Sequence, residues 1–436
     1  MSAAASPRVK RMQRTSVTLL LIGCALNYID RTALSVANPL IRHDLGLSIA
    51  EMGLLLSAFL WAYAAAQLPT GAMVDRYGPR VVIGGAVVLW SIAQGVAGLV
   101  NGFWQFVVAR IFLGVGEGPQ FSGLIRVVRD WFNVRERGLP TGTAMSGSKV
   151  GPAIAPPLLT ALMLAFGWRW MFVILGVGGV VLGIVWYALY REVGEAGLTE
   201  AERASLVDGE PPQVADRVSF EDWRRLFGYR ATWGMVLGFF GEVYMTWVYL
   251  SWLPGYLEIE RHMSIPTTGL VAAIPFGAGI IGSIGNGWVM DRLIRRGFSP
   301  INSCKIPLVS ALIGVAVFTT IGALTADNFL AISAITVALL FNGGCGPMAW
   351  ALSSVAAPRH CTASLGSIQN CGGYIGGALA PTITGFVVQG TGSFVPALLV
   401  SAAMGVAASL LYVFMVPGKP IEVAAFATAR VRLAVE

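Results

Sequence analysis

Long apolar segments that alternate with short charged ones restrict the fold of this 436-residue chain more than any other feature. When the apolar runs are cut at the charged clusters, twelve segments of helix length result. Roughly 20 helical residues, at ~1.5 Å rise each, cross the ~30 Å hydrocarbon core of a bilayer. The segments are residues 15–38, 50–74, 80–100, 103–127, 138–165, 170–190, 229–257, 266–290, 304–325, 329–352, 360–389 and 394–416. The pattern predicts an all-α integral membrane protein with twelve transmembrane helices.

The charge of the chain is low and unevenly distributed. Charged residues make up 12% of the chain and the mean hydropathy is +0.68, whereas ordinary globular chains carry about 25% charged residues. With the N-terminus inside, 24 of the 30 Lys and Arg lie on the cytoplasmic side, three lie outside and three lie within helices. This asymmetry is the positive-inside pattern. It predicts a protein of the inner (plasma) membrane with both termini cytoplasmic, and it argues against nucleic acid as a partner.

The residue types that support catalysis or metal binding are scattered. The five cysteines have no CxxC spacing, and the three histidines fall at predicted loop positions. No nucleophile, base and orienting group follow one another in a recognisable arrangement. We therefore expect no metal site, no bound cofactor and no enzymatic activity.

Two similar motifs indicate an internal repeat. Gly71-xxx-Asp75-Arg76 returns as Gly287-xxx-Asp291-Arg292, which lies 216 residues later and so close to half of the chain. Many transporters consist of two such halves, with a central site between them. The repeat predicts two pseudo-symmetric six-helix bundles, and we expect both Asp-Arg pairs to act as gating loops that clamp neighbouring helices.

The domain boundaries follow from the same repeat and from one long polar stretch. Residues 191–228 contain 14 Asp, Glu, Lys or Arg in 38 positions, which is typical of a cytoplasmic linker. The expected domains are an N-terminal bundle at 1–190, this linker, and a C-terminal bundle with a tail at 229–436.

Charged residues inside the apolar segments are candidates for the functional site. Asp30 and Arg31 lie deep in the first segment, and each charge at a helix centre costs roughly 2.5 to 3.5 kcal/mol. Arg110 and Glu117 lie seven residues apart in the fourth segment, and Lys149 lies in the fifth. These groups either face a water-filled cavity with a ligand or neutralise one another permanently. For Glu117 the alternatives are a titrating carboxyl and a fixed salt bridge to Arg110; Lys149 either faces the cavity or pairs with an acid.

The motif G-xxx-D-R-xG-xR after the second segment, with its degenerate echo after the eighth, resembles the major facilitator superfamily over residues 15–416. NYIDRTALSVANP and RIFLGVGEGPQF further resemble its anion:cation symporter branch, which contains proton-coupled transporters of sugar acids, hexuronates and other organic anions. The resemblance implies the major facilitator fold. It also implies that Asp30 and Glu117 take up protons, that Arg31 binds the substrate carboxylate, and that Arg110 is the charge partner of Glu117.

Polar side chains in both halves are expected to complete the substrate site. Lys149 would meet a second acidic group, and the remaining contacts are expected from Tyr28, Tyr63, Gln369 and Asn370. For the two amides, hydrogen bonding between helices is an equally good explanation. Additional candidates are Asn27, Glu242, Tyr244, Trp247 and Asn342.

These observations predict a proton-coupled symporter that imports a small organic anion, such as a sugar acid or carboxylate, by alternating access. It is expected to be a monomer, with the substrate anion and membrane lipid as its partners. The alternative is a drug/proton antiporter, because Gly147-xxx-Gly151-Pro152 partly resembles the glycine- and proline-rich motif of such exporters. Three cations set against three acids in the membrane favour an anion as the substrate.

Overall fold

The computed structural model describes residues 6–133, 136–207, 224–358 and 361–421, which fold into helices without any β-strand in these ranges. The chain separates into two compact units. Unit 1 comprises residues 1–214 and 250–273, and unit 2 comprises residues 215–249 and 274–436. The domain boundaries expected from the sequence are not tested by this division and stay a prediction.

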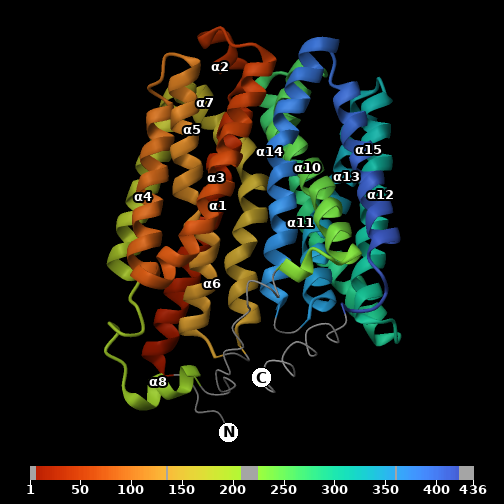
Figure 1. Cartoon of the computed structure of the whole chain (residues 1–436). Helices are drawn as coiled ribbons and strands as arrows, with labels where there is room; N and C mark the ends of the chain where they lie inside the picture. Colours follow the sequence, from red (N-terminus) through yellow and green to blue (C-terminus); the bar gives the residue numbers. More distant parts are fainter. Residues whose placement is uncertain (1–5, 134–135, 208–223, 359–360, 422–436) are drawn as a thin grey trace. The chain divides into compact units, whose positions relative to one another are not determined.

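Unit 1 is a helix bundle in which α1 packs on α7, and α3 and α4 pack on α5 (Figure 1). The glycines at its helix crossings explain the close packing, as described below. Its helices are α1 Pro7–Val36, α2 Asn38–Leu45, α3 Ile49–Tyr77, α4 Pro79–Ala97, α5 Phe103–Glu117, α6 Pro119–Trp131, α7 Gly138–Leu189 and α8 Glu200–Val207. The last ten residues of α10 also belong to unit 1, where the Ser35 hydroxyl donates to the Ser251 carbonyl at 2.6 Å.

Unit 2 contains the remaining helices, among which α12 packs on α13 and α15, and α13 packs on α14. Its buried core is formed by the apolar faces of these helices, with Leu308, Leu312 and Leu352 fully buried. Its helices are α10 Arg230–Ile259 and α11 Ile265–Arg295, both shared with unit 1, and α12 Pro300–Leu324, α13 Asn328–Ala356, α14 Thr362–Thr391 and α15 Val395–Met415.

The helix count agrees with the twelve predicted spans. Nine helices in the described ranges are long and apolar enough to cross a membrane. One of them, α7, has 52 residues and consists of two helices joined at Gly167. The short helices α5 and α6 follow one another and together match the fourth predicted segment, and the 30-residue α10 matches the seventh. The prediction of a twelve-helix membrane fold is confirmed.

The kink in α7 replaces the predicted loop between residues 165 and 170. Gly167 has φ 81°, a conformation that favours glycine, so the chain changes direction there without a longer turn. The next residue, Trp168, donates its indole N–H to the Asp44 carboxylate at 2.7 Å. This hydrogen bond lowers the pKa of Asp44 and ties the kink to α2.

The two Asp-Arg motifs lie in helices and not in loops, which corrects the prediction from the sequence. The helix α3 continues to Tyr77, and only Gly78, with φ 80°, separates it from α4. Residues 71–77 contain no proline and only one glycine, so nothing breaks the helix before Gly78. In the same way α11 continues to Arg295.

Matching glycine pairs hold one helix crossing in each unit. In unit 1, a Cβ on Gly147 would lie 2.5 Å from the Leu21 carbonyl oxygen, and one on Gly151 would lie 2.7 Å from that of Ala25. In unit 2, a Cβ on Gly372 would lie 2.5 Å from the Val236 oxygen, and a Cβ four residues later would collide with the next turn of α10. The equivalent crossings, α1 with α7 and α10 with α14, support the internal repeat.

We expect Gly147→Val to destabilise the protein by about 1–3 kcal/mol, because the added side chain must force α7 away from the backbone of α1. The matched control is Gly178→Val, also in α7, where a Cβ meets no atom within 4 Å. Thermal unfolding in detergent measures both effects. An unchanged midpoint for Gly147→Val, or an equal drop for the control, would show that this crossing is not tightly packed.

Candidate functional site

Four charged side chains form a buried cluster within unit 1. Asp30 and Arg31 come from α1, and Arg110 and Glu117 come from α5. None of the four is more than 4% exposed. Two acids and two bases make the cluster formally neutral when all four are charged. Any change of one proton therefore leaves an uncompensated charge in a buried site, which costs several kcal/mol.

Glycines in α5 bring this cluster together. A Cβ on Gly114 would collide with the Phe59 carbonyl of α3, and a Cβ on Gly116 would lie 2.7 Å from the Cβ of Trp90 in α4. Only a glycine at each position lets α5 lie this close to both helices. Glu117 is the last residue of α5, and Gly118 separates it from α6. The carboxylate is thus held at a break between two helices.

Arg31 is held by one carboxylate and three aromatic rings. Its Nε–H donates to Oε2 of Glu117 at 2.7 Å, between side chains that are 3% and 0% exposed. The guanidinium carbon lies 4.7 Å from the Tyr28 ring centroid, 5.0 Å from that of Phe59 and 4.6 Å from that of Tyr63. Such cation–π contacts stabilise a cation that has lost its water. The structure therefore brings together Tyr28, Tyr63 and Arg31 as the sequence suggested.

Phe59 was not identified from the sequence, although it contacts both arginines. The Arg110 guanidinium lies 5.1 Å from the centroid of the ring that Arg31 also approaches. Phe59 stacks on Tyr63, one helical turn later, with their centroids 5.7 Å apart. This i, i+4 aromatic pair facing an embedded arginine is the sequence signal that could have revealed it.

The charge partner of Glu117 differs from the expectation. The family resemblance implied Arg110 as its partner. In the structure Glu117 is paired with Arg31, and Arg110 forms no ion pair with any described residue. Two helical turns, ~10.5 Å, separate residues 110 and 117, which exceeds the reach of a direct salt bridge on one helix. Arg110 is 1% exposed, and its Nε and one terminal nitrogen have no hydrogen-bond partner in the described structure.

Asp30 and Asn27 add polar atoms to the same buried region. The Asp30 backbone carbonyl accepts a hydrogen bond from Gln94 Nε2 at 3.4 Å, whereas its Oδ1 has no partner among the described residues. Asn27 is fully buried, and neither atom of its amide has a partner there. Buried polar atoms without partners are costly unless a ligand, a proton or water satisfies them at some stage. Their presence makes this region a candidate for the functional site.

Lys149 lies on α7, within the same unit as the charged cluster. It is partly exposed and lies between Gly147 and Gly151, the two residues that contact α1. Residues that are two positions apart on a helix lie on nearly opposite faces. Because Gly147 and Gly151 face α1, Lys149 lies on the face of α7 that points away from α1. A role in choosing the substrate stays a prediction.

The candidate residues in unit 2 form a second, less charged group. Glu242 is 4% exposed, and its Oε1 accepts a hydrogen bond from Thr246 Oγ1 at 3.4 Å. The same hydroxyl lies 3.1 Å from Oδ1 of Asn342, so α10 and α13 are joined through these three side chains. Tyr244 and Trp247 are buried on α10.

The two amides of α14 differ in their surroundings. Gln369 is fully buried, and its Nε2 donates to the Ala349 carbonyl of α13 at 3.3 Å. That contact is the interhelical hydrogen bond that the sequence left open as an alternative. Asn370 is partly exposed. Substrate contact by either amide stays a prediction.

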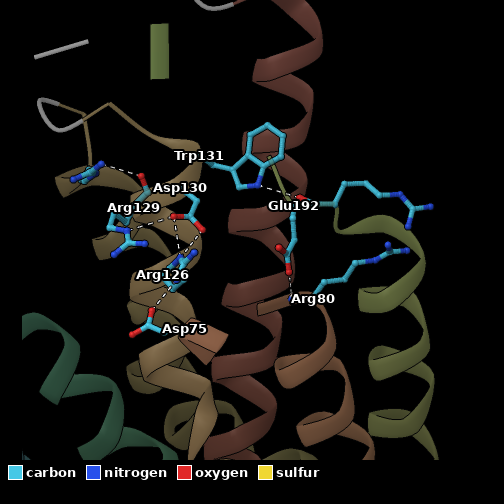
Figure 2. A network of polar contacts seen from close by, with 9 residues as sticks. Asp75, Arg80, Arg126, Arg129, Asp130, Trp131 and Glu192 are labelled. Atoms are coloured by element: carbon cyan, nitrogen blue, oxygen red, sulfur yellow. Dashed lines mark hydrogen bonds and ion pairs between the residues drawn. The ribbon is translucent and has the colours of Figure 1, made fainter. Parts of the chain in front are cut away.

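Asp75, one of the two expected gating residues of unit 1, belongs to a network of charges (Figure 2). Asp75 Oδ1 pairs with a terminal nitrogen of Arg126 at 2.7 Å, and Arg126 Nε pairs with Asp130 at 2.7 Å. Nearby, the Glu192 carboxylate accepts from the backbone N–H of Arg80 at 3.4 Å, near the start of α4. These contacts join α3 to α6 and residue 192 to α4.

The arginines that follow the two aspartates behave alike. Arg76 stacks on Tyr77 at 5.2 Å, and Arg292 stacks on Trp288 at 5.2 Å. Asp291, unlike Asp75, forms no ion pair with any residue that the structure describes. The two motifs therefore agree in their helical backbone and in the aromatic contact of their arginines, but they differ in whether the aspartate forms an ion pair.

Comparisons with known proteins agree with this architecture. Residues 20–381 match the sequence profile of the Major Facilitator Superfamily. The chain is 44% identical over 411 residues to a probable L-galactonate transporter of Escherichia coli, covering 94% of this chain and 91% of that protein. It is 31% identical over 417 residues to an E. coli D-galactonate transporter, covering 93% and 96%.

Solved structures give the same fold. A D-xylose-proton symporter superposes with a TM-score of 0.71 at 17% identity, covering 93% of this chain and 99% of that one. An inward-facing bacterial homologue of the lysosomal transporter Spinster gives 0.70 at 20% identity, covering 97% of each chain.

Proposed function

This chain belongs to the major facilitator superfamily, a family of membrane transporters and not of enzymes, and we propose that it is a proton-coupled symporter for a sugar acid. The observation that carries the proposal is the buried ion pair between Arg31 and Glu117. Several relatives are named as galactonate, galactarate/glucarate and hexuronate transporters, and these names support a six-carbon sugar acid as the substrate.

The ion pair supplies a simple coupling mechanism. While Glu117 is charged, it occupies Arg31 and the four-residue cluster is neutral. When Glu117 takes up a proton, Arg31 loses its anionic partner and the cluster carries one excess positive charge. A substrate carboxylate then replaces Glu117 at the guanidinium, where it accepts charge-assisted hydrogen bonds. Proton and anion thus bind together, and loss of the proton lets Glu117 compete for Arg31 again.

Asp30 gives the cluster a second group that can take up a proton. Its carboxyl is 1% exposed, and its Oδ1 has no hydrogen-bond partner within the described residues. Protonation of Asp30 leaves Arg110 as a further excess charge beside the site. The two acids allow one or two protons per anion, and the aromatic rings of Tyr28 and Tyr63 hold Arg31 in place during the exchange.

The remaining parts of the proposal follow the sequence. Gln369 and Asn370 would contact the sugar hydroxyls in one state of an alternating-access cycle. The protein would act as a monomer in the inner membrane, with both termini in the cytoplasm. The Gly147-xxx-Gly151 motif, which suggested a drug antiporter, is accounted for by the contact of α7 with α1.

Binding of candidate substrates to the purified protein tests this function. Ligand-induced shifts in thermal unfolding would be recorded with hexonates, hexuronates, aldarates, aromatic acids and lipophilic cations. We expect stabilisation by one class of sugar acid that grows as the pH falls, since proton and anion bind together. Stabilisation by lipophilic cations alone would favour the antiporter.

We expect Lys149→Gln to lower the uptake of a six-carbon dicarboxylate by about tenfold while leaving that of a monocarboxylate within about twofold, because one ammonium contact to a second carboxylate is lost. The two uptake rates in the same vesicles control for folding. An equal loss for both substrates, or a wild-type protein that carries no dicarboxylate, would exclude this role for Lys149.

A further inference from the structure

A groove of about 730 Å³ lies within unit 1, between α3, α4 and the α5–α6 junction. None of the four residues of the charged cluster lines it, and its lining contains hardly any polar group. Its lining residues are Ala62, Ala65, Ala66, Pro69, Thr70, Met73, Tyr77 from α3, Val81, Val82, Gly85, Ala86, Leu89 from α4, and Ile111, Val115, Gly116, Pro119 from α5 and α6.

The shape of the groove fits one extended hydrocarbon chain. It follows α3 from Ala62 to Tyr77, a length of about 22 Å at the helical rise. One leaflet of the hydrocarbon core is about 15 Å thick, so the groove extends along the full depth of a leaflet. Small residues form much of its lining, whereas Met73, Leu89 and Ile111 are 44%, 40% and 40% exposed. Such exposed apolar side chains suit contact with a hydrocarbon chain.

A positive charge lies at the Tyr77 end of the groove. The Arg76 guanidinium is 5.2 Å from the centroid of the Tyr77 ring, which itself lines the groove. Arg76 is exposed and forms no ion pair within the described part of the chain, since the neighbouring Asp75 is paired with Arg126. A basic side chain at the end of an apolar groove complements an acyl chain with an anionic head group.

We propose that this groove binds an anionic glycerophospholipid, with one acyl chain along α3 and α4 and the phosphate at Arg76. The site is distinct from the transport site, so the proposal does not depend on the identity of the transported substrate. Unlike the transported anion, the lipid would contact apolar side chains along most of its acyl chain.

Native mass spectrometry of the full-length protein in detergent, titrated with phosphatidylglycerol or phosphatidylcholine, tests the proposal. Gly85→Leu places a larger side chain on a residue that lines the groove, and its Cβ meets no atom within 4 Å. We expect it to reduce the occupancy of the tightest-bound phosphatidylglycerol at least about fivefold. Gly178→Leu, on α7 and outside the groove, is the matched control and should bind as the wild type does.

The head group is tested by Arg76→Gln, with the repeat-related Arg292→Gln as control. Arg76→Gln should lower the preference for phosphatidylglycerol over phosphatidylcholine by about fivefold, and Arg292→Gln should keep it. Unchanged lipid occupancy in Gly85→Leu would overturn the site. If Arg76→Gln keeps the preference for phosphatidylglycerol, the head-group contact is wrong. If the wild type instead forms a dimer without bound lipid and Gly85→Leu does not, the groove is occupied by a second copy of the chain and not by lipid.

Discussion

Replacement of Arg31 by alanine is expected to abolish anion transport, with a loss of substrate affinity of at least about 30-fold. A buried charge pair that loses one partner typically costs 2–5 kcal/mol or more, and every ~1.4 kcal/mol corresponds to tenfold in affinity. Arg31 already binds a carboxylate in this structure, because its Nε lies 2.7 Å from Oε2 of Glu117. Equilibrium binding of the labelled sugar acid to the purified variant measures the effect.

Two further variants separate binding from folding. Arg31→Ala leaves Glu117 buried without its partner, which by itself can destabilise the protein by about 3–5 kcal/mol. The double variant Arg31→Ala/Glu117→Gln removes both charges and should recover stability without recovering binding. Arg31→Lys keeps the charge but not the planar fork, so its affinity should fall between those of wild type and Arg31→Ala. Wild-type affinity in the double variant would refute the assignment of Arg31.

Glu117→Gln is expected to keep anion binding and exchange but to lose accumulation driven by a proton gradient. Glutamine imitates the protonated acid, so Arg31 is permanently available to the substrate. Binding should then become less dependent on pH, and labelled anion should still exchange for unlabelled anion across the membrane. Measurements of counterflow and of uphill uptake in the same proteoliposomes compare the two properties.

The exchange activity of Glu117→Gln is its own control for folding. A variant that exchanges anion at about the wild-type rate but does not accumulate it places the coupling step at Glu117. Uphill uptake at the wild-type level would instead show that Glu117 is a fixed member of a salt bridge. Loss of both activities, in a protein with normal thermal unfolding, would place Glu117 in binding and not in coupling.

Much of the fold could be predicted because the membrane leaves few choices. Apolar length and the positions of the charges determine where helices can cross, and the repeat of Asp75-Arg76 at Asp291-Arg292 divides the chain into halves. The loop boundaries were less predictable. Residues 71–77 are polar enough to suggest a loop, but a helix can leave the hydrocarbon region and continue until a residue such as Gly78 ends it.

The members of the charged cluster were predictable from their cost in the membrane, but their pairing was not. Asp30, Arg31, Arg110 and Glu117 all lie in apolar segments, which identified them. Which acid meets which base depends on how α1 lies against α5, and one sequence does not fix that relation. The same limit applies to Phe59, which contacts two arginines on other helices.

Uptake of labelled galactonate into proteoliposomes, with and without an inward proton gradient, tests the central claim most directly. Coupled entry of proton and anion predicts accumulation above the external concentration only with the gradient, and its collapse when a protonophore is added. Equal uptake with and without the gradient, for galactonate and for every other sugar acid tried, would contradict proton-coupled symport by this protein.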